Sequence, residues 1–261
     1  MILDEIKAET LRRIEREKAS VSEHELKEKA FSLKEKSHFK FRKAIEKDGL
    51  SFICEVKKAS PSKGIITESF NWLEIASEYE KAGADCISVL TEPKWFKGSD
   101  KYLEQISEKA SIPTLRKDFT CDSYMIYQAK CFGADAVLLI AAILSEKQLY
   151  DYMRICSDLG LTALVEAHDK DEIIKSLSCG AELVGVNNRN LKDFTVDASN
   201  CLRLRELVGD KALFVAESGI KTAEDIELLS KNGVDGVLIG ETMMLAENKK
   251  EMLSRLKGKL K

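Results

Sequence analysis

The chain has 261 residues, with 41 Lys or Arg against 44 Asp or Glu, and a net charge of −3 at pH 7. Because the two signs are interspersed, no surface for a polyanion is expected, and nucleic acid is not a predicted partner. No apolar run approaches the length of a membrane span and the first residues lack the pattern of a secretory signal, so we expect no membrane partner and a cytoplasmic location.

The cysteines and histidines form neither a disulfide pattern nor a metal-binding one. The seven cysteines are odd in number and widely spaced, with no C-x-x-C, which is typical of reduced and mostly buried thiols. The three histidines lie far apart, and His168 with Glu166 is too small a set for a metal ion. We therefore expect no metal site.

Residues 1–48 are predicted to be helical. One stripe of the first helix is formed by Leu3, Ile6, Thr10, Leu11 and Ile14. The high charge of this segment is typical of a solvated helix face, which we favour over a binding role. A helical segment at this place could also act as a lid that excludes water from a site.

The first expected strand carries two opposite charges in phase. On an extended strand Glu55 and Lys57 share one face, while Phe52, Cys54 and Val56 share the other. Taken alone, the pattern equally fits a surface ion pair on an edge strand. Four later apolar runs also end in a polar residue, at Lys117, Glu166, Asn187 and Glu217. This recurrence favours a functional reading.

An internal repeat predicts the architecture. A triplet of glycine, a small apolar residue and an acid recurs at 83–85, 133–135, 180–182 and 233–235, at intervals of 50, 47 and 53 residues. Each copy follows a helical pattern and precedes an apolar strand, and glycine suits the left-handed position that closes a helix. One further strand–helix unit fits between copies. The repeating unit is therefore about 25 residues long, and eight units fill 51–257.

This arithmetic predicts an α/β fold, a single (βα)₈ TIM barrel with an N-terminal helical extension. We expect residues 1–48 to form the extension, packed on the barrel, and residues 49–261 to form the barrel. A doubly wound open sheet is the alternative. That fold usually has a phosphate-binding glycine cluster after its first strand, and the sequence has no G-x-G-x-x-G or Walker-type loop.

In such a barrel the carboxyl ends of the strands converge on one mouth. The predicted catalytic set at this mouth comprises Glu55, Lys57, Lys117, Glu166, Asn187 and Glu217. Buried amines and carboxylates shift one another's pKa and can supply a general acid together with a general base. A ring of salt bridges that merely closes the barrel is the structural alternative, and buried charges are rarely retained for stability alone.

A second cluster lies on the last two loops, where glycine turns and helix starts offer backbone N–H groups to a phosphate. Ser218 and Gly219 follow the seventh strand, and Gly240 and Glu241 follow the eighth. Arg189 could add a bidentate clamp. Gly219 and Gly240 as simple turn residues are the alternative.

The run from Glu55 to Gly64 resembles the first-strand signature of indole-3-glycerol phosphate synthases. The resemblance covers essentially the whole chain and continues at 88–92, 96–99, 116–119, 138–140, 164–166, 185–189, 216–220 and 238–240. It implies conversion of 1-(2-carboxyphenylamino)-1-deoxyribulose 5-phosphate to indole-3-glycerol phosphate, with loss of carbon dioxide and water. The resemblance implies no cofactor, a small phosphorylated substrate and no obligatory protein partner.

The resemblance also implies residue roles. Lys117 would be the general acid and Glu166 the base of the dehydration, while Lys57 and Glu55 would position substrate and shuttle protons; the division of acid work between the two lysines stays open. Hydroxyls and lysines would be oriented by Asn187 and Glu217. Substrate and phosphate would be bound by Ser60, Arg189, Ser218, Gly219, Gly240 and Glu241. The aromatic ring would be lined by Phe96, Phe119 and Leu138.

One departure and two competing functions remain. Glu241 stands where family members often carry a small hydroxyl residue, so we expect its backbone N–H to be used and its side chain to face away. A lysine at a barrel strand end could instead form a Schiff base, as in class I aldolases. A barrel that binds a phosphate ligand for regulation is the non-enzyme alternative.

Overall fold

The computed structural model describes residues 2–33, 38–190 and 195–258. Within these residues eight parallel strands close into a barrel in the order β1-β10-β9-β8-β7-β6-β5-β4. The strands are β1 (Ser51–Val56), β4 (Cys86–Leu90), β5 (Thr114–Lys117), β6 (Ala136–Ile140), β7 (Thr162–Ala167), β8 (Leu183–Asn187), β9 (Leu213–Glu217) and β10 (Gly236–Ile239). The predicted (βα)₈ barrel is confirmed, and the open-sheet alternative is wrong.

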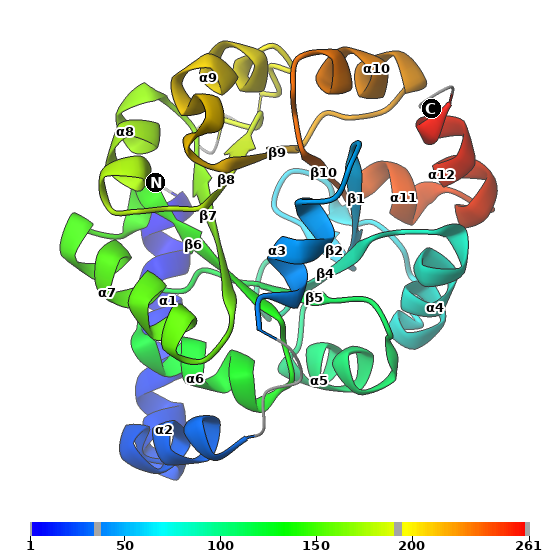
Figure 1. Ribbon diagram of the computed structural model, residues 1–261. Coiled ribbons are helices and arrows are strands. Elements are labelled where there is room, and N and C mark those ends of the chain that lie inside the picture. Colours follow the sequence, from blue (N-terminus) through cyan, green and yellow to red (C-terminus); the bar gives the residue numbers. More distant parts are fainter. Residues whose placement is uncertain (1, 34–37, 191–194, 259–261) are drawn as a thin grey trace.

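The strands alternate with helices that ring the barrel (Figure 1). The helices are α4 (Trp72–Ala82), α5 (Asp100–Lys109), α6 (Ser123–Cys131), α7 (Glu146–Asp158), α8 (Lys170–Ser178), α9 (Asn200–Val208), α10 (Ala223–Lys231), α11 (Glu241–Leu245) and α12 (Lys249–Lys257), with short 3₁₀ turns η1 (Ala141–Ile143) and η2 (Gly209–Lys211). After β1 the chain forms a small antiparallel hairpin of β2 (Ala59–Ser60) and β3 (Gly64–Ile65). None of the described helices is long and apolar enough to span a bilayer.

The repeated triplets do two structural jobs. Their glycines take the left-handed conformation that ends a helix, with φ of 90°, 81°, 88° and 71° at Gly83, Gly133, Gly180 and Gly233. In three copies the acid accepts a hydrogen bond of 2.7–2.9 Å from a backbone N–H near the start of the barrel strand that precedes the triplet in the chain. The pairs are Asp85 with Phe52 of β1, Asp135 with Thr114 of β5, and Asp235 with Phe214 of β9. Each triplet thus ends one helix, and three of the four also join two neighbouring strands through the side chain of the acid.

The extension contains α1 (Ile2–Ser20), α2 (Glu23–Ser32) and α3 (Lys40–Ile45). On α1 the residues Ile6, Thr10 and Ile14 are buried as expected, whereas Leu11 is 36% exposed. The predicted apolar stripe was therefore too wide at Leu11. The first helix packs against the barrel through a narrower seam.

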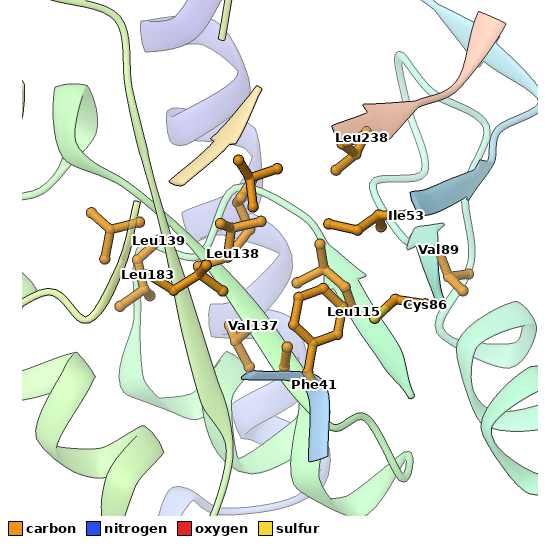
Figure 2. Packing of buried hydrophobic residues seen from close by; sticks show 14 of the residues in the cluster. Phe41, Ile53, Cys86, Val89, Leu115, Val137, Leu138, Leu139, Leu183 and Leu238 are labelled. Atoms are coloured by element: carbon orange, nitrogen blue, oxygen red, sulfur yellow. The ribbon is translucent and has the colours of Figure 1, made fainter. Parts of the chain in front are cut away.

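Helix α3 crosses the amino end of the barrel, where the strands begin (Figure 1). The backbone N–H of Arg42 donates to Thr162 at the start of β7, and Ser51 at the start of β1 donates to the carbonyl of Ala44. Phe41 of α3 is fully buried in the cluster of hydrophobic residues that fills the molecule (Figure 2). This helix therefore closes the end of the barrel opposite to the carboxyl ends of the strands.

The thiols match the sequence-based expectation. All seven cysteines are free, and five of them are buried: Cys54, Cys86, Cys121, Cys156 and Cys201. Burial raises the pKa of several of these thiols, to about 12 for Cys54, because an apolar environment disfavours the thiolate. They pack as small hydrophobic side chains.

Candidate active site

A cavity of about 1010 Å³ opens at the carboxyl ends of the barrel strands. All fifteen residues that the sequence predicted for the site line it: Glu55, Lys57, Ser60, Phe96, Lys117, Phe119, Leu138, Glu166, Asn187, Arg189, Glu217, Ser218, Gly219, Gly240 and Glu241. They come from loops and strands spread over most of the chain. The alternation of side chains along each strand, repeated around a closed barrel, is what gathers them.

The centre of the cavity is an amine held between two carboxylates. Lys117 Nζ at the end of β5 lies 2.7 Å from Glu166 Oε2 and 3.2 Å from Glu217 Oε2. Burial alone would lower the pKa of Lys117, but the charges of Glu166, Glu217 and Glu55 outweigh this and raise it well above its usual range. The amine is therefore protonated before substrate arrives and can serve as an acid.

The two carboxylates differ in ionisation. Burial opposes the charge of Glu166, yet Lys117, His168 and the amide of Asn187 at 3.3 Å from Oε1 stabilise the carboxylate and lower its pKa. Glu217 responds in the opposite direction. Burial and the nearby charge of Glu166 outweigh Lys117 and raise the pKa of Glu217 to about 7. Two carboxylates with such different proton affinities beside one ammonium can hold and pass a proton at neutral pH.

Gly185 on β8 makes room for this arrangement, and the sequence did not identify it as a site residue. A Cβ at this position would lie 2.2 Å from Glu217 Oε1, closer than any side-chain contact allows. This oxygen is buried and has no hydrogen-bond partner among the described residues. This oxygen therefore packs against the Gly185 backbone, and only glycine leaves room for it there.

A second ion pair lies on β1 and just after it. Lys57 Nζ is 2.5 Å from Glu55 Oε1, and Ser88 Oγ on β4 is 3.5 Å from Glu55 Oε2. The Glu55 side chain is buried, and its backbone carbonyl accepts from the Tyr79 hydroxyl. Gly240 lies directly against the pair, since a Cβ there would be 2.4 Å from Glu55 Oε1 and 2.7 Å from Lys57 Nζ.

Gly240→Ala should therefore displace the Glu55–Lys57 pair and lower kcat/KM by roughly 10²-fold, the effect of a misplacement of about 1 Å in an active site. Steady-state turnover measures the effect, and far-UV circular dichroism checks that the fold is retained. Gly236→Ala on the same strand is the matched control, because a Cβ there would meet Val215 and Ile45 at ordinary contact distances of 3.4–3.6 Å. Equal losses in both variants would contradict the assignment.

The loops after β8, β9 and β10 form one end of the cavity. Ser218 and Gly219 both have positive φ, at 67° and 81°, which turns the backbone sharply after β9. The carbonyl of Ser218 accepts from Asn188, and Thr242 donates to the carbonyl of Ile220, so neighbouring loops are tied together. Such consecutive turns are the usual seat of a phosphate in these barrels.

Glu241 lies at the start of α11 and is among the residues that line the cavity. Its carboxylate lies 3.3 Å from Lys63 Nζ of the loop between β2 and β3. The nearby ammonium offsets the charge of Glu241. The expectation that this side chain faces away from a bound phosphate stays a prediction.

The opposite wall is apolar. The rings of Phe96 and Phe119 have centroids 6.0 Å apart, and Leu138 is buried beside the mouth. The loop that carries Phe96 is held by Glu92, whose buried carboxylate accepts the backbone N–H groups of residues 94, 95 and 96 at 2.7–2.9 Å. Glu92 was not predicted to be a positioning residue, because nothing in the local sequence pattern shows which N–H groups its carboxylate accepts.

Three more apolar residues near strand ends line the cavity and were also missed: Leu90 of β4 and Ile140 of β6, and Leu238 of β10 across the barrel. The sequence-based prediction was limited to strands that end in a polar residue, so these apolar residues were not identified. The alternation of side chains along a strand turns them into the cavity as well. His168, beside Glu166, was considered only as a metal ligand. Within the described residues no group of three or more His, Cys, Asp or Glu side chains is placed to hold a metal ion.

The helices of the extension brace the site from outside. Arg13 of α1 lies 2.9 Å from Asp118, directly after Lys117, and Lys7 Nζ donates to the carbonyl of Ile143. None of the described residues of α1, α2 or α3 is among those that line the cavity. The described helices of the extension therefore do not cover the mouth, and α1 instead holds the loops that follow β5 and β6.

The sequence and the fold are similar to those of known proteins. The family model described as indole-3-glycerol phosphate synthase matches residues 3–256. A protein of that name from Ruminiclostridium cellulolyticum is 52% identical over 258 residues, which is 99% of both chains, and one from Lachnoclostridium phytofermentans is 49% identical over the full length of both. Among solved structures, 3-hexulose-6-phosphate synthase from Salmonella typhimurium has a TM-score of 0.65 at 13% identity, covering 79% of this chain and 96% of its own. That likeness concerns the barrel fold alone.

Proposed function

Because this chain belongs to the indole-3-glycerol phosphate synthase family, we propose that its barrel mouth closes the indole ring by general acid–base catalysis with its own side chains. The substrate is 1-(2-carboxyphenylamino)-1-deoxyribulose 5-phosphate, and the products are indole-3-glycerol phosphate, carbon dioxide and water. The enzyme is a carboxy-lyase of tryptophan biosynthesis. The observation that carries the residue roles is the Lys117 ammonium between Glu166 and Glu217 inside the cavity.

Lys117 donates a proton from Nζ to the ketone oxygen of the substrate while the aromatic carbon attacks the carbonyl carbon. The C=O electron pair becomes a hydroxyl, and the carboxylate leaves as carbon dioxide with return of its electron pair to the ring. In the dehydration Lys57 donates a proton to the hydroxyl, which departs as water, and Glu166 accepts the proton lost from the ring carbon beside the nitrogen. The raised pKa of Lys117 and the lowered pKa of Glu166 support this starting state, because acid and base are both in their working forms.

The remaining residues bind and orient. Lys57, paired with Glu55, positions the substrate and exchanges protons at the other side of the cavity, and Asn187 holds Glu166. The phosphate is bound by Arg189, Ser218, Gly219, Gly240 and the Glu241 backbone, with Ser60 at the rim. The aromatic ring lies against Phe96, Phe119 and Leu138, where exclusion of water favours loss of the carboxylate.

The location of the enzyme, its requirements and its domain organisation are part of the same proposal. The enzyme acts in the cytoplasm without a metal, a cofactor or an obligatory protein partner. Residues 1–48 form an extension of the barrel of residues 49–261.

The test is fluorescence-monitored turnover of the carboxyphenylamino substrate by the purified chain in the presence of a chelator and without a cofactor. Indole fluorescence should appear in the wild type and fall by about 10²–10⁴-fold in Glu166→Gln, which keeps the shape of the side chain without its basicity. Borohydride is the control for the aldolase alternative. A stable adduct on Lys57 or Lys117 would support a Schiff base, whereas tight binding without turnover would support a regulatory barrel.

A further inference from the structure

We propose that His168, anchored by Glu172, is a positioning residue that holds Glu166 ionised beside Lys117 until the acid has donated its proton. The inference rests on the proposed role of Glu166. It assigns work to two residues that no part of the reaction scheme above uses.

The imidazole of His168 bridges two carboxylates. It follows β7 directly, two residues after Glu166, so both side chains leave the chain on the same side. Its Nε2 lies 3.4 Å from Glu166 Oε1, and its Nδ1 lies 3.1 Å from Glu172 Oε2. The Nε2 atom is buried and has no hydrogen-bond partner within the described residues. A buried polar atom aimed at the proposed base indicates a use beyond packing.

The start of α8 fixes this ring. Asp169 caps the helix by accepting the backbone N–H of Glu172 at 2.9 Å. The Glu172 carboxylate turns back and accepts both the ring and the backbone N–H of His168, the latter at 2.8 Å. From the next unit Asn200 donates to the carbonyl of His168. The helix cap therefore sets the orientation of a ring in the active site.

Two carboxylates lie at the ring nitrogens, Glu166 of β7 and Glu172 of α8, and the charge of Glu217 of β9 also acts on the ring. Burial favours the neutral imidazole, but these groups outweigh it and raise the pKa of His168. In its protonated form the imidazole donates Nδ1–H to Glu172 and directs Nε2–H at Glu166. Glu166 then lies between the cations of His168 and Lys117, which explains why it stays ionised although it is buried.

This placement has a consequence for the order of proton transfers. With only Lys117 beside it, a buried carboxylate could take the lysine proton directly, and the acid and base would both be lost. The second cation at His168 opposes that transfer. When Lys117 has protonated the substrate ketone, one of the two cations is gone and the basicity of Glu166 rises. The base thus becomes stronger at the step that follows the work of the acid.

The experiment is the pH dependence of kcat for His168→Gln. Loss of the imidazolium should raise the apparent pKa of the coupled Glu166–Glu217 pair, so the acid limb of the kcat profile should shift to higher pH by about one unit. On that limb kcat should be about 10-fold lower than in the wild type. KM should change by less than about 3-fold. Glu172→Gln should move the limb in the same direction by less. His24→Gln is the control, because His24 is 82% exposed in a surface pair with Glu28 and should leave the profile unchanged.

A direct titration separates the possible failures. In the imidazole NMR spectrum the pKa of His168, identified by its absence in His168→Gln, should fall in Glu166→Gln because the two groups stabilise each other reciprocally. If Glu166→Gln turns over at the wild-type rate, the proposed role of Glu166 is wrong. If Glu166→Gln is impaired while the His168 titration and the pH profile stay unchanged, only the role of His168 is overturned. Should His168→Gln fail to fold, the titration in Glu166→Gln decides alone, with the His168 signal identified by His168→Asn.

Discussion

Lys117→Met should lower kcat by about 10³-fold or more while leaving substrate binding within a few-fold of the wild type. The methionine fills a similar volume without an ammonium, so the ketone oxygen loses its proton donor and the developing charge loses its nearest cation. Glu166 and Glu217 also lose the charge between them, which raises the pKa of both carboxylates and favours their protonated forms before the reaction begins. One substitution therefore removes the acid and lowers the ionised fraction of the base.

Single-turnover kinetics with product fluorescence measures the loss, and calorimetric titration with indole-3-glycerol phosphate measures binding. Lys147→Met on α7 is the control, because this amine is 85% exposed in a surface pair with Asp151 and lies outside the cavity. Wild-type turnover in Lys117→Met would show that the acid is another group, with Lys57 as the next candidate. Equal loss of binding and turnover would instead point to a role in holding the substrate.

The polar strand ends of this site were predictable because their placement follows from local rules, whereas Phe96 and Phe119 were predicted only from the family resemblance. A period of two along each strand puts Lys117 and Glu166 on the inner face, and the glycine–acid triplets give the number of units in the barrel. Neither inference requires knowledge of which strands are neighbours. Closure of the barrel then places every inward-facing strand end at the same mouth, whichever unit supplies it.

The features that were missed depend on contacts between distant segments. Gly185 has a role because the Glu217 side chain of the neighbouring strand packs directly against it. Glu92 has a role because the loop that follows it places three backbone N–H groups within hydrogen-bonding distance of its carboxylate. His168 gains its place from Glu172, one helical turn further along, and from Glu166. The contacts of the extension could not be predicted for a similar reason. The charge pattern of α1 does not reveal that Arg13 pairs with Asp118 beside the mouth.

Arg116 shows how the outer face of the same strand supports the site. It neighbours Lys117 on β5 but points the other way, and its guanidinium is fully buried. It lies 2.7 Å from Asp100 and 3.7 Å from Asp118, and it donates to the carbonyl of Met125 at 2.8 Å. The network continues from Asp118 to Arg13 of α1. Burial would raise the pKa of Asp118, but the two arginines outweigh it and lower that pKa.

Arg116→Met should reduce the free energy of unfolding by about 3–5 kcal/mol at pH 7, because it leaves buried carboxylate and carbonyl groups without their donor. Denaturant unfolding measures the loss. Arg203→Met is the control, since the Arg203–Asp197 pair is more than half exposed and solvent screening leaves it little effect on stability. A loss in Arg116→Met no larger than in this control would mean that the buried network contributes little.

The pH dependence of that loss distinguishes charge pairing from packing. A carboxyl group whose pKa is lowered on folding stabilises the protein above its unfolded pKa of 3.8, and this stabilisation disappears as the pH falls through the folded value. Without Arg116 the folded pKa of Asp118 rises, so Asp118 is protonated sooner in the variant as the pH is lowered. The difference in unfolding free energy between wild type and variant should therefore be largest at pH 7 and smaller at pH 4. A difference that stays constant between the two pH values would assign the loss to the volume and hydrogen bonds of the side chain, and the support of Lys117 by the β5 outer face would then be steric.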